Sequence, residues 1–204
     1  MASKTIMRGV PADMNHSTTS RSFFEEKYKR NEDPWKFASS SYELGRYDAI
    51  INALSFRRYR RAFEPACSIG VLTEQLAIIC DRVDATDISS AAAEQAVQRC
   101  RALTNVIIKQ GSLPADIPAG TFDLIVFSEV GYYFNKPQLR LLIDQLMSCL
   151  ESEGIFLAAH WLGTSSDHIL DGNEVHDIVS STNGLIHDHV EHHPGFRLDR
   201  WICQ

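Results

Sequence analysis

The chain has 204 residues, of which 44% are hydrophobic, and a formal net charge of −6. This length and composition suffice for one domain with a buried core. The negative charge argues against nucleic acid as the main partner, since phosphate backbones require basic surfaces, and no apolar run reaches the ~18 residues of a membrane span.

The cysteines indicate the redox compartment. An odd number, five, is scattered through apolar segments without a Cys-x-x-Cys pair: Cys67, Cys80, Cys100, Cys149 and Cys203. Thiols in such positions are typical of buried free cysteines in a reducing environment. Since the N-terminus also lacks a secretory leader, we expect a cytoplasmic protein with no membrane partner.

The N-terminal region is predicted to form a tail and a cap. Residues 1–19 are polar without apolar periodicity, which predicts a disordered tail. Two helices follow, with Pro34 between them and Ser40 or Ser41 at the start of the second. Their apolar residues recur at helical spacing: Phe23, Phe24 and Tyr28, then Leu44, Tyr47, Ile51 and Leu54. We expect residues 20–58 to cover a cleft, with the basic run 57–61 as a solvated helix end.

The stretch 61–77 is the most informative one. It predicts a short strand ending near Glu64, a turn of small residues from Ala66 to Gly70, and then a helix. Such a turn allows the backbone to approach a ligand closely, and the amides at a helix start can bind electron-rich groups.

A second strand, within residues 83–89, carries an acidic residue at its end. Asp87 lies 87 − 64 = 23 positions after Glu64. This spacing is close to the ~20 residues expected for a carboxylate that binds ribose hydroxyls. The pair predicts a nucleoside site.

Strands and helices alternate through the rest of the chain. Strands are predicted at residues 105–109, 122–127 and 155–159, and helices at 91–103, from Asn135 to a stop at Glu153–Gly154, and at 175–181. Residues 185–193 and 196–203 indicate two antiparallel strands around a turn. The order predicts one open α/β sandwich, with residues 59–204 as its core.

The acidic strand end at Glu64, the small-residue turn, Asp87 and the strand Phe122–Ser128 resemble the class I S-adenosylmethionine-dependent methyltransferases from Arg61 to the C-terminus. Three segments, 33–37, 41–47 and 67–74, are similar to the rhizobial nodulation protein S family within that class. The resemblance implies a Rossmann-like seven-stranded sandwich, with five parallel strands and a C-terminal antiparallel hairpin. It also implies N-methylation of the deacetylated glucosamine at the non-reducing end of a chitooligosaccharide during Nod-factor synthesis.

The sequence departs from the class at two places. The usual turn has three glycines, whereas Ala66 and Ser68 occupy the first two positions here and only Gly70 remains. Both residues are small enough for a ligand to approach, but neither accepts a positive φ freely. After the third strand, where the class often has an acidic residue, this chain has Ser112. Its hydroxyl can still bond an adenine amino group.

The resemblance also implies roles toward S-adenosylmethionine. Asp87 would bind the ribose, Ile88 the adenine face, and Ser112 with Leu113 the adenine edge. Glu64 would lie near the amino acid end of the cofactor or cap the next helix instead. The remaining cofactor-binding candidates are Ala66, Gly70 and Ser128, with Arg46 opposite the cofactor carboxylate or simply on the surface.

The acceptor side is predicted from residues that follow the fourth and fifth strands, where ligands bind in open sheets. Glu129 could accept the proton of an ammonium group, or face the cofactor, or be structural; His160 could share the proton transfer. Aromatic rings could stack on a sugar or belong to the core: Trp35, Tyr132, Tyr133 and Trp161.

Other interpretations remain open. His187, His189, His192 and His193 could suggest a metal, but methyl transfer from a sulfonium needs none, and we expect no metal site. The acceptor could be another amine, a carboxylate or a hydroxyl, or the altered turn could mark a cofactor-binding pseudo-enzyme. A dehydrogenase is disfavoured because its dinucleotide turn needs the missing glycines. We expect a small-molecule oligosaccharide acceptor and a monomer or weak dimer.

Overall fold

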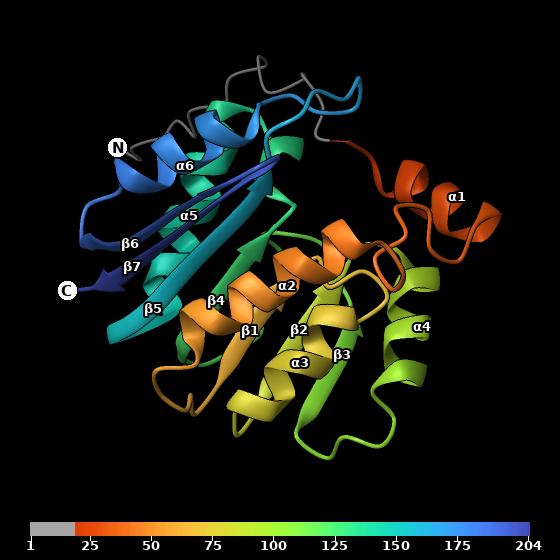
Figure 1. Cartoon of the computed structure of the whole chain (residues 1–204), viewed down its shortest axis with the longest axis horizontal. Helices are drawn as coiled ribbons and strands as arrows, with labels where there is room; N and C mark the ends of the chain where they lie inside the picture. The colour runs from red at the N-terminus through yellow and green to blue at the C-terminus, as the bar shows by residue number, and fades with distance from the viewer. Residues whose placement is uncertain (1–18) are drawn as a thin grey trace, which may run out of the picture.

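The computed structural model describes residues 19–204, and Figure 1 shows their arrangement. Seven strands of this part of the chain form a sheet in the order β3-β2-β1-β4-β5-β7-β6. The strands are β1 Ala62–Pro65, β2 Val83–Asp87, β3 Val106–Gln110, β4 Phe122–Ser128, β5 Leu150–Trp161, β6 Leu185–His193 and β7 Phe196–Cys203. The helices are α1 Arg21–Arg30, α2 Ser41–Leu54, α3 Val71–Ile79, α4 Ser90–Arg99, η1 Gly131–Tyr133, α5 Lys136–Cys149 and α6 Gly172–Ser180.

The predicted topology is confirmed. Strands β1 to β5 pair in parallel, while β7 runs antiparallel to β5 and to β6. Parallel neighbours require crossover helices, which cover both faces of the sheet. This explains why β4 is almost continuously buried and why its sequence is an unbroken apolar run.

Two hydrophobic layers enclose the sheet (Figure 1). On one face, α2 and α3 pack through Ile50, Leu54 and Leu76 against residues that include Leu124 and Leu157. On the other face, the buried residues of α5 and α6 pack against the remaining strand residues. Because consecutive strand residues face opposite layers, each buried strand contributes to both cores.

Local sequence signals set the helix starts. The side chain of Ser20 accepts from Phe23 N–H at the start of α1, and that of Ser89 accepts from Ala92 N–H at the start of α4. Capping boxes open α5, with Asn135 and Gln138, and α6, with Asp171 and Glu174. The α6 box explains why this helix starts at Gly172, three residues before the predicted start.

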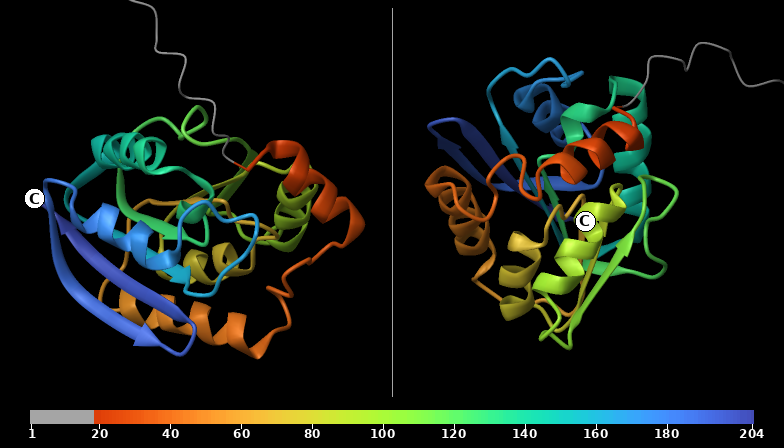
Figure 2. Two further views of the ribbon diagram at one scale, coloured as in Figure 1. Left: turned by 90° about the horizontal axis from the view of Figure 1, so that it is seen from above. Right: turned by 90° about the vertical axis from the view of Figure 1, so that its right-hand side faces the viewer.

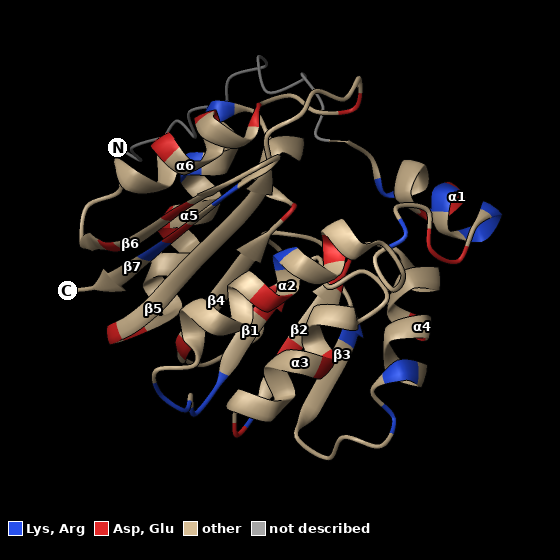
Figure 3. Ribbon diagram, viewed as in Figure 1, with Lys and Arg blue, Asp and Glu red and all other residues tan. Residues whose placement is uncertain are grey.

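Two sequence predictions about helix ends were wrong. Helix α5 ends at Cys149, so Glu153 and Gly154 lie inside β5, where Glu153 has a φ of 60° beside a register shift against β4. Helix α2 ends at Leu54, so the run 57–61 forms the loop into β1 rather than a helix end. Figure 3 shows this basic loop at the end of the sheet opposite α1.

The basic run is also largely neutralised. Arg58 pairs with Asp81, Arg60 with Glu151, and Arg61 with Asp84. The predicted tail, 1–19, lies outside the described residues except for Thr19, which donates a 3.0 Å hydrogen bond to the Asp167 carbonyl. None of the helices within residues 19–204 is long and apolar enough to cross a membrane.

Candidate active site

A cavity of about 440 Å³ lies at the carboxyl ends of the strands, below α1 and the loop after β5. Figure 2 (left) shows this end of the sheet, with α1 beside α4. The cavity walls come from seven regions of the chain: Thr19, Phe24 and Tyr28; Trp35, Phe37, Tyr42 and Glu43; Ala66 and Ser68; Thr86, Asp87 and Ile88; Gly111 and Leu113; Glu129, Val130, Tyr132, Tyr133 and Phe134; Trp161, Ser165 and His168.

The turn after β1 has a left-handed backbone at all three positions where the class has glycine. The φ angles are 58° at Ala66, 51° at Ser68 and 78° at Gly70. Such angles cost an L-residue roughly 1–2 kcal/mol, so contacts must hold the turn in place. Ser68 N–H donates to Asp87 at 2.8 Å and its hydroxyl accepts from Tyr28 at 2.5 Å. A Cβ at Gly70 would lie 3.0 Å from Ala96, so Gly70 serves the packing of α3 on α4.

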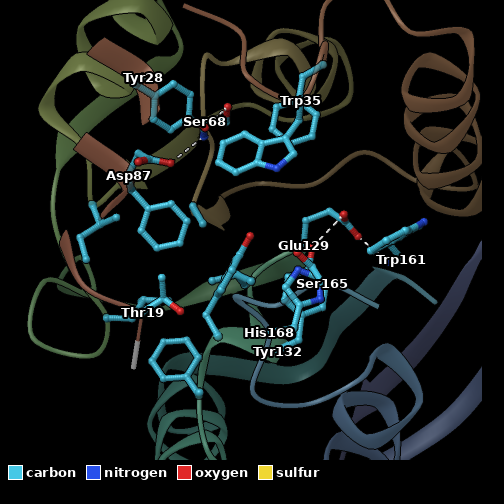
Figure 4. Close-up of a pocket in the computed structure, with 18 of the residues that line it drawn as sticks. Thr19, Tyr28, Trp35, Ser68, Asp87, Glu129, Tyr132, Trp161, Ser165 and His168 are labelled. Atoms are coloured by element: carbon cyan, nitrogen blue, oxygen red, sulfur yellow. Dashed lines mark hydrogen bonds between the residues drawn. The ribbon is translucent and has the colours of Figure 1, made fainter. Parts of the chain in front are cut away.

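Asp87 lies on one side of the cavity with Ser68 and Tyr28 (Figure 4). Its two oxygens accept from the N–H groups of Ser68, at 2.8 Å, and Ser89, at 2.9 Å. Burial raises the pKa of this carboxyl to about 6. A carboxylate offers about four lone-pair directions, so each oxygen keeps capacity for one further donor. Asp87 therefore suits a diol such as the ribose of the predicted cofactor.

Glu64 lies beneath the turn, outside the cavity wall. Its carboxyl is buried and accepts a 2.6 Å hydrogen bond from the Thr73 hydroxyl in α3. Burial raises its pKa to about 8, and the nearby Asp87 adds to that effect. At neutral pH, Glu64 in the described structure is therefore largely protonated and ties β1 to α3.

Glu64→Gln should remove a pH dependence of stability. A carboxyl whose folded pKa, about 8, exceeds its unfolded value near 4.5 stabilises the fold below the unfolded pKa. That contribution is lost as pH rises from the unfolded pKa to the folded pKa. The largest possible loss is about 1.4 kcal/mol for each pKa unit between the two values. Glutamine keeps an acceptor for Thr73 without the charge.

Urea unfolding of wild type and Glu64→Gln at acidic and mildly alkaline pH measures this effect. We expect the variant to gain stability relative to wild type on the alkaline side. Equal pH slopes for the two proteins would contradict the assignment.

Glu129 lies on the opposite side of the cavity, after β4 (Figure 4). Its φ is 56°, and both of its carboxylate oxygens are engaged. One accepts from Trp161 N–H at 2.6 Å; the other accepts from the Tyr132 hydroxyl at 2.9 Å and lies 3.1 Å from an Arg46 nitrogen. Three positive or donor groups hold this carboxylate in place.

Arg46 is only 1% exposed and does not line the cavity. Its guanidinium forms ion pairs with Glu129 and with Glu43, which is one turn earlier on α2. The sequence interpretation as a surface arginine is thus wrong, and a role toward a cofactor carboxylate would require Arg46 to exchange one of these partners. Glu43, which sequence reasoning missed, lines the cavity beside it.

His160 belongs to the core. It is fully buried, and its Nε2 accepts from Gly131 N–H at 3.1 Å. The proton must therefore be on Nδ1, which lies 3.2 Å from Nε2 of His176; Nδ1 of His176 then donates to Asp199 at 2.8 Å. Burial holds the pKa of His160 well below its usual value. The predicted proton transfer by His160 does not fit this geometry.

Aromatic rings form much of the cavity wall. Trp35 stacks on Phe37 with ring centroids 5.6 Å apart, and Tyr133 meets Phe24 edge-on at 4.9 Å. His168 stacks on Tyr132 at 3.7 Å. All four aromatic residues predicted from the sequence line the cavity, namely Trp35, Tyr132, Tyr133 and Trp161.

Some predicted residues lie elsewhere. Ser112 lies in a turn in which its N–H donates to Asp116, and it does not line the cavity. Its neighbours Gly111 and Leu113 do. Ser128 is buried behind the wall, next to Glu129. Ile88 lines the cavity beside Asp87.

The C-terminal histidines lie on the hairpin, where His189 and His193 both contact Glu191. No group of three or more side chains that could hold a metal occurs in the described residues.

A mixed sheet of this order, with a small-residue turn after β1 and a buried acid at the end of β2, defines a class I S-adenosylmethionine-dependent methyltransferase fold. The family described as Nodulation protein S (NodS) matches residues 19–178. The chain belongs to this family.

Relatives and solved structures agree with this assignment. Nodulation protein S of Bradyrhizobium diazoefficiens is 30% identical over 68% of the chain, and that of Sinorhizobium fredii is 29% identical over 60%. The chain spans 65% and 58% of the lengths of these two proteins.

A putative methyltransferase of Pseudomonas syringae is 36% identical, with a TM-score of 0.71 over 80% of this chain and 99% of that one. The N-methyltransferase NodS of Bradyrhizobium japonicum, in complex with S-adenosyl-L-homocysteine, has a TM-score of 0.80 at 24% identity, over 92% of this chain and 99% of that one.

Proposed function

We propose that this protein is an S-adenosylmethionine-dependent N-methyltransferase whose acceptor is the free amine of an amino sugar. The acceptor we favour is the non-reducing-end glucosamine of a deacetylated chitooligosaccharide, as in Nod-factor biosynthesis. The observation that carries the proposal is the arrangement of polar groups in the cavity: Asp87 lies beside Ser68 on one side, and Glu129 lies with Tyr132, Trp161 and His168 on the other.

The cofactor half fits S-adenosylmethionine. Asp87 keeps acceptor capacity for two ribose hydroxyls, and Ile88 and Leu113 offer apolar surface for adenine. The side chains of Ala66 and Ser68 are small, so the backbone of the turn is accessible from the cavity. When bound, the cofactor supplies an activated methyl group, so the protein must position the acceptor and keep its nitrogen unprotonated.

The acceptor half fits a sugar that carries an amine. Trp161, Trp35 and the tyrosines Tyr132 and Tyr133 provide flat faces for a pyranose ring. The group of Arg46, Glu43 and Glu129 combines one positive with two potential negative charges. When both acids are ionised, the excess negative charge favours a cation, and a glucosamine ammonium supplies one.

Deacetylated chitooligosaccharide should be methylated, and the fully acetylated sugar should be inert, because an amide nitrogen shares its lone pair with the carbonyl. Transfer of labelled methyl from S-adenosylmethionine to each sugar measures this difference. The rate on the free amine should also rise with pH until deprotonation of the ammonium ceases to limit it. Equal turnover of the two sugars would rule out an amine acceptor.

Three other sequence predictions remain part of this proposal. The five cysteines are all unpaired, four of them buried, which favours a reducing compartment and supports a cytoplasmic enzyme. A monomer or weak dimer stays a prediction, as does the role of residues 20–58 as a cap, although α1 and α2 both contribute residues to the cavity wall.

A further inference from the structure

Two side chains of the cavity wall have a buried polar atom without a partner among residues 19–204. They are Tyr42, through its hydroxyl, and His168, through Nδ1; Oε2 of the neighbouring Glu43 is paired with Arg46. The Tyr42 hydroxyl lies near Arg46, which has no lone pair to accept its proton. Buried polar groups without partners are uncommon, and their presence in one cavity indicates that a ligand completes them.

The two acids of this wall are held differently. Glu129 receives hydrogen bonds from Trp161 N–H and the Tyr132 hydroxyl in addition to its ion pair with Arg46. These contacts occupy both oxygens of Glu129, so a proton from a ligand would have to displace one of its present partners. Glu43 has the Arg46 ion pair through Oε2 and no second donor among the described residues.

We propose that Tyr42, Glu43 and His168 form the subsite for the acceptor's amino sugar, and that Glu43 takes the proton from its ammonium group. This inference rests on the proposed function and replaces Glu129 as the base. Glu129 then anchors Arg46 and Tyr132. The Tyr42 hydroxyl donates to a sugar oxygen, and the His168 ring, already stacked on Tyr132, bonds a second hydroxyl.

Proton transfer to Glu43 precedes methyl transfer. A Glu43 oxygen takes one proton from the ammonium and leaves a neutral amine with a lone pair. That lone pair forms the nitrogen–carbon bond to the methyl group of S-adenosylmethionine, while the carbon–sulfur bond breaks and its electron pair stays on sulfur. The product is a methylammonium ion, and the carboxylic acid of Glu43 returns its proton to solvent.

The surroundings of Glu43 suit this role. Burial raises its pKa to about 7, opposed by Arg46 on its own helix and aided by Glu129 after β4 and Asp33 in the loop before α2. A base with a pKa near the working pH accepts and releases a proton with least loss.

Matched variants separate the two acids. Glu43→Gln should lower kcat on the deacetylated sugar by about 100-fold or more and leave affinity for S-adenosylhomocysteine within about threefold. Asp48→Asn, on the exposed face of the same helix, is the control and should behave as wild type. A larger kcat loss in Glu129→Gln than in Glu43→Gln, at equal folded fraction, would overturn the proposal.

A second measurement does not depend on turnover. In protein labelled with ¹³C at glutamate carboxyls and bound to S-adenosylhomocysteine, the Glu43 signal, assigned by its loss in Glu43→Gln, should titrate near neutral pH. It should also shift when deacetylated chitooligosaccharide is added. A Glu43 chemical shift that stays constant between about pH 5 and about pH 9, or that does not change when the sugar is added, would refute the assignment. If wild type methylates no amino sugar, the acceptor proposed above fails, and the Glu43 titration still decides whether this carboxyl is a base.

Discussion

Arg46→Leu should destabilise the protein by about 3–5 kcal/mol at mildly alkaline pH. The substitution removes the cation that pairs with both Glu43, which is buried, and Glu129, which is partly buried, and leaves both carboxylates without it. Without Arg46, the pKa of Glu43, which burial already raises to about 7, should rise further, because Arg46 opposes that effect. The deficit should therefore be largest at high pH, where both carboxyls are charged, and should shrink as pH falls and they become protonated in the folded state.

Urea unfolding across pH measures the effect, and Arg46→Lys supplies the matched control. Lysine keeps the charge but cannot reach both acids with one planar group, so it should recover part of the loss. Adding Glu43→Gln to Arg46→Leu should also restore stability, because it removes one of the unpaired charges. A stability of Arg46→Leu within about 1 kcal/mol of wild type would show that the ion pairs contribute little.

Asp87→Ala should weaken the binding of S-adenosylhomocysteine by at least about tenfold, the loss expected when charge-assisted hydrogen bonds to two hydroxyls disappear. A second effect adds to the first. Asp87 also accepts from Ser68 N–H, which holds the turn in its left-handed conformation. Loss of that contact lets Ala66 and Ser68 relax away from the geometry that the ligand requires.

Isothermal titration with S-adenosylhomocysteine tests this prediction, and the thermal unfolding curve checks that the domain remains folded. Asp87→Asn should lose less than Asp87→Ala because one oxygen acceptor remains. Asp81→Ala, which removes an exposed acid near the opposite end of β2, is the control and should bind normally. Unchanged affinity in Asp87→Ala would exclude Asp87 from the cofactor site.

Most of the fold could be predicted from the sequence because its signals are local. The run 122–127 forms the buried strand β4, and Leu185–His193 and Phe196–Cys203 form the hairpin with the predicted bounds. The end of α5 could not be read in this way. A glycine stop at Gly154 was expected, but pairing of Leu150 with Phe122 in the sheet ends the helix earlier.

The side-chain directions on β5 and the docking of α2 could not be predicted from the sequence. Both faces of β5 are covered, so periodicity does not tell which of His160 and Trp161 meets the cavity; the structure places Trp161 there. Glu43 gave no signal in the sequence, and Arg46 was a candidate only through the family resemblance, toward the cofactor carboxylate. The contact of Arg46 with Glu129 depends on how α2 docks against the sheet, a long-range arrangement that no local signal encodes.

The hydrogen bonds from Gly131 through His160 and His176 to Asp199 all point in one direction. They fasten η1, which carries Tyr132 and Tyr133, through Gly131 to residues of β5, α6 and β7. The backbone of this segment therefore does not depend on the ring at position 133 for its place. Evolution could exchange that ring for a smaller or more polar side chain and so change the range of acceptors, while the scaffold that aligns donor and acceptor is inherited intact.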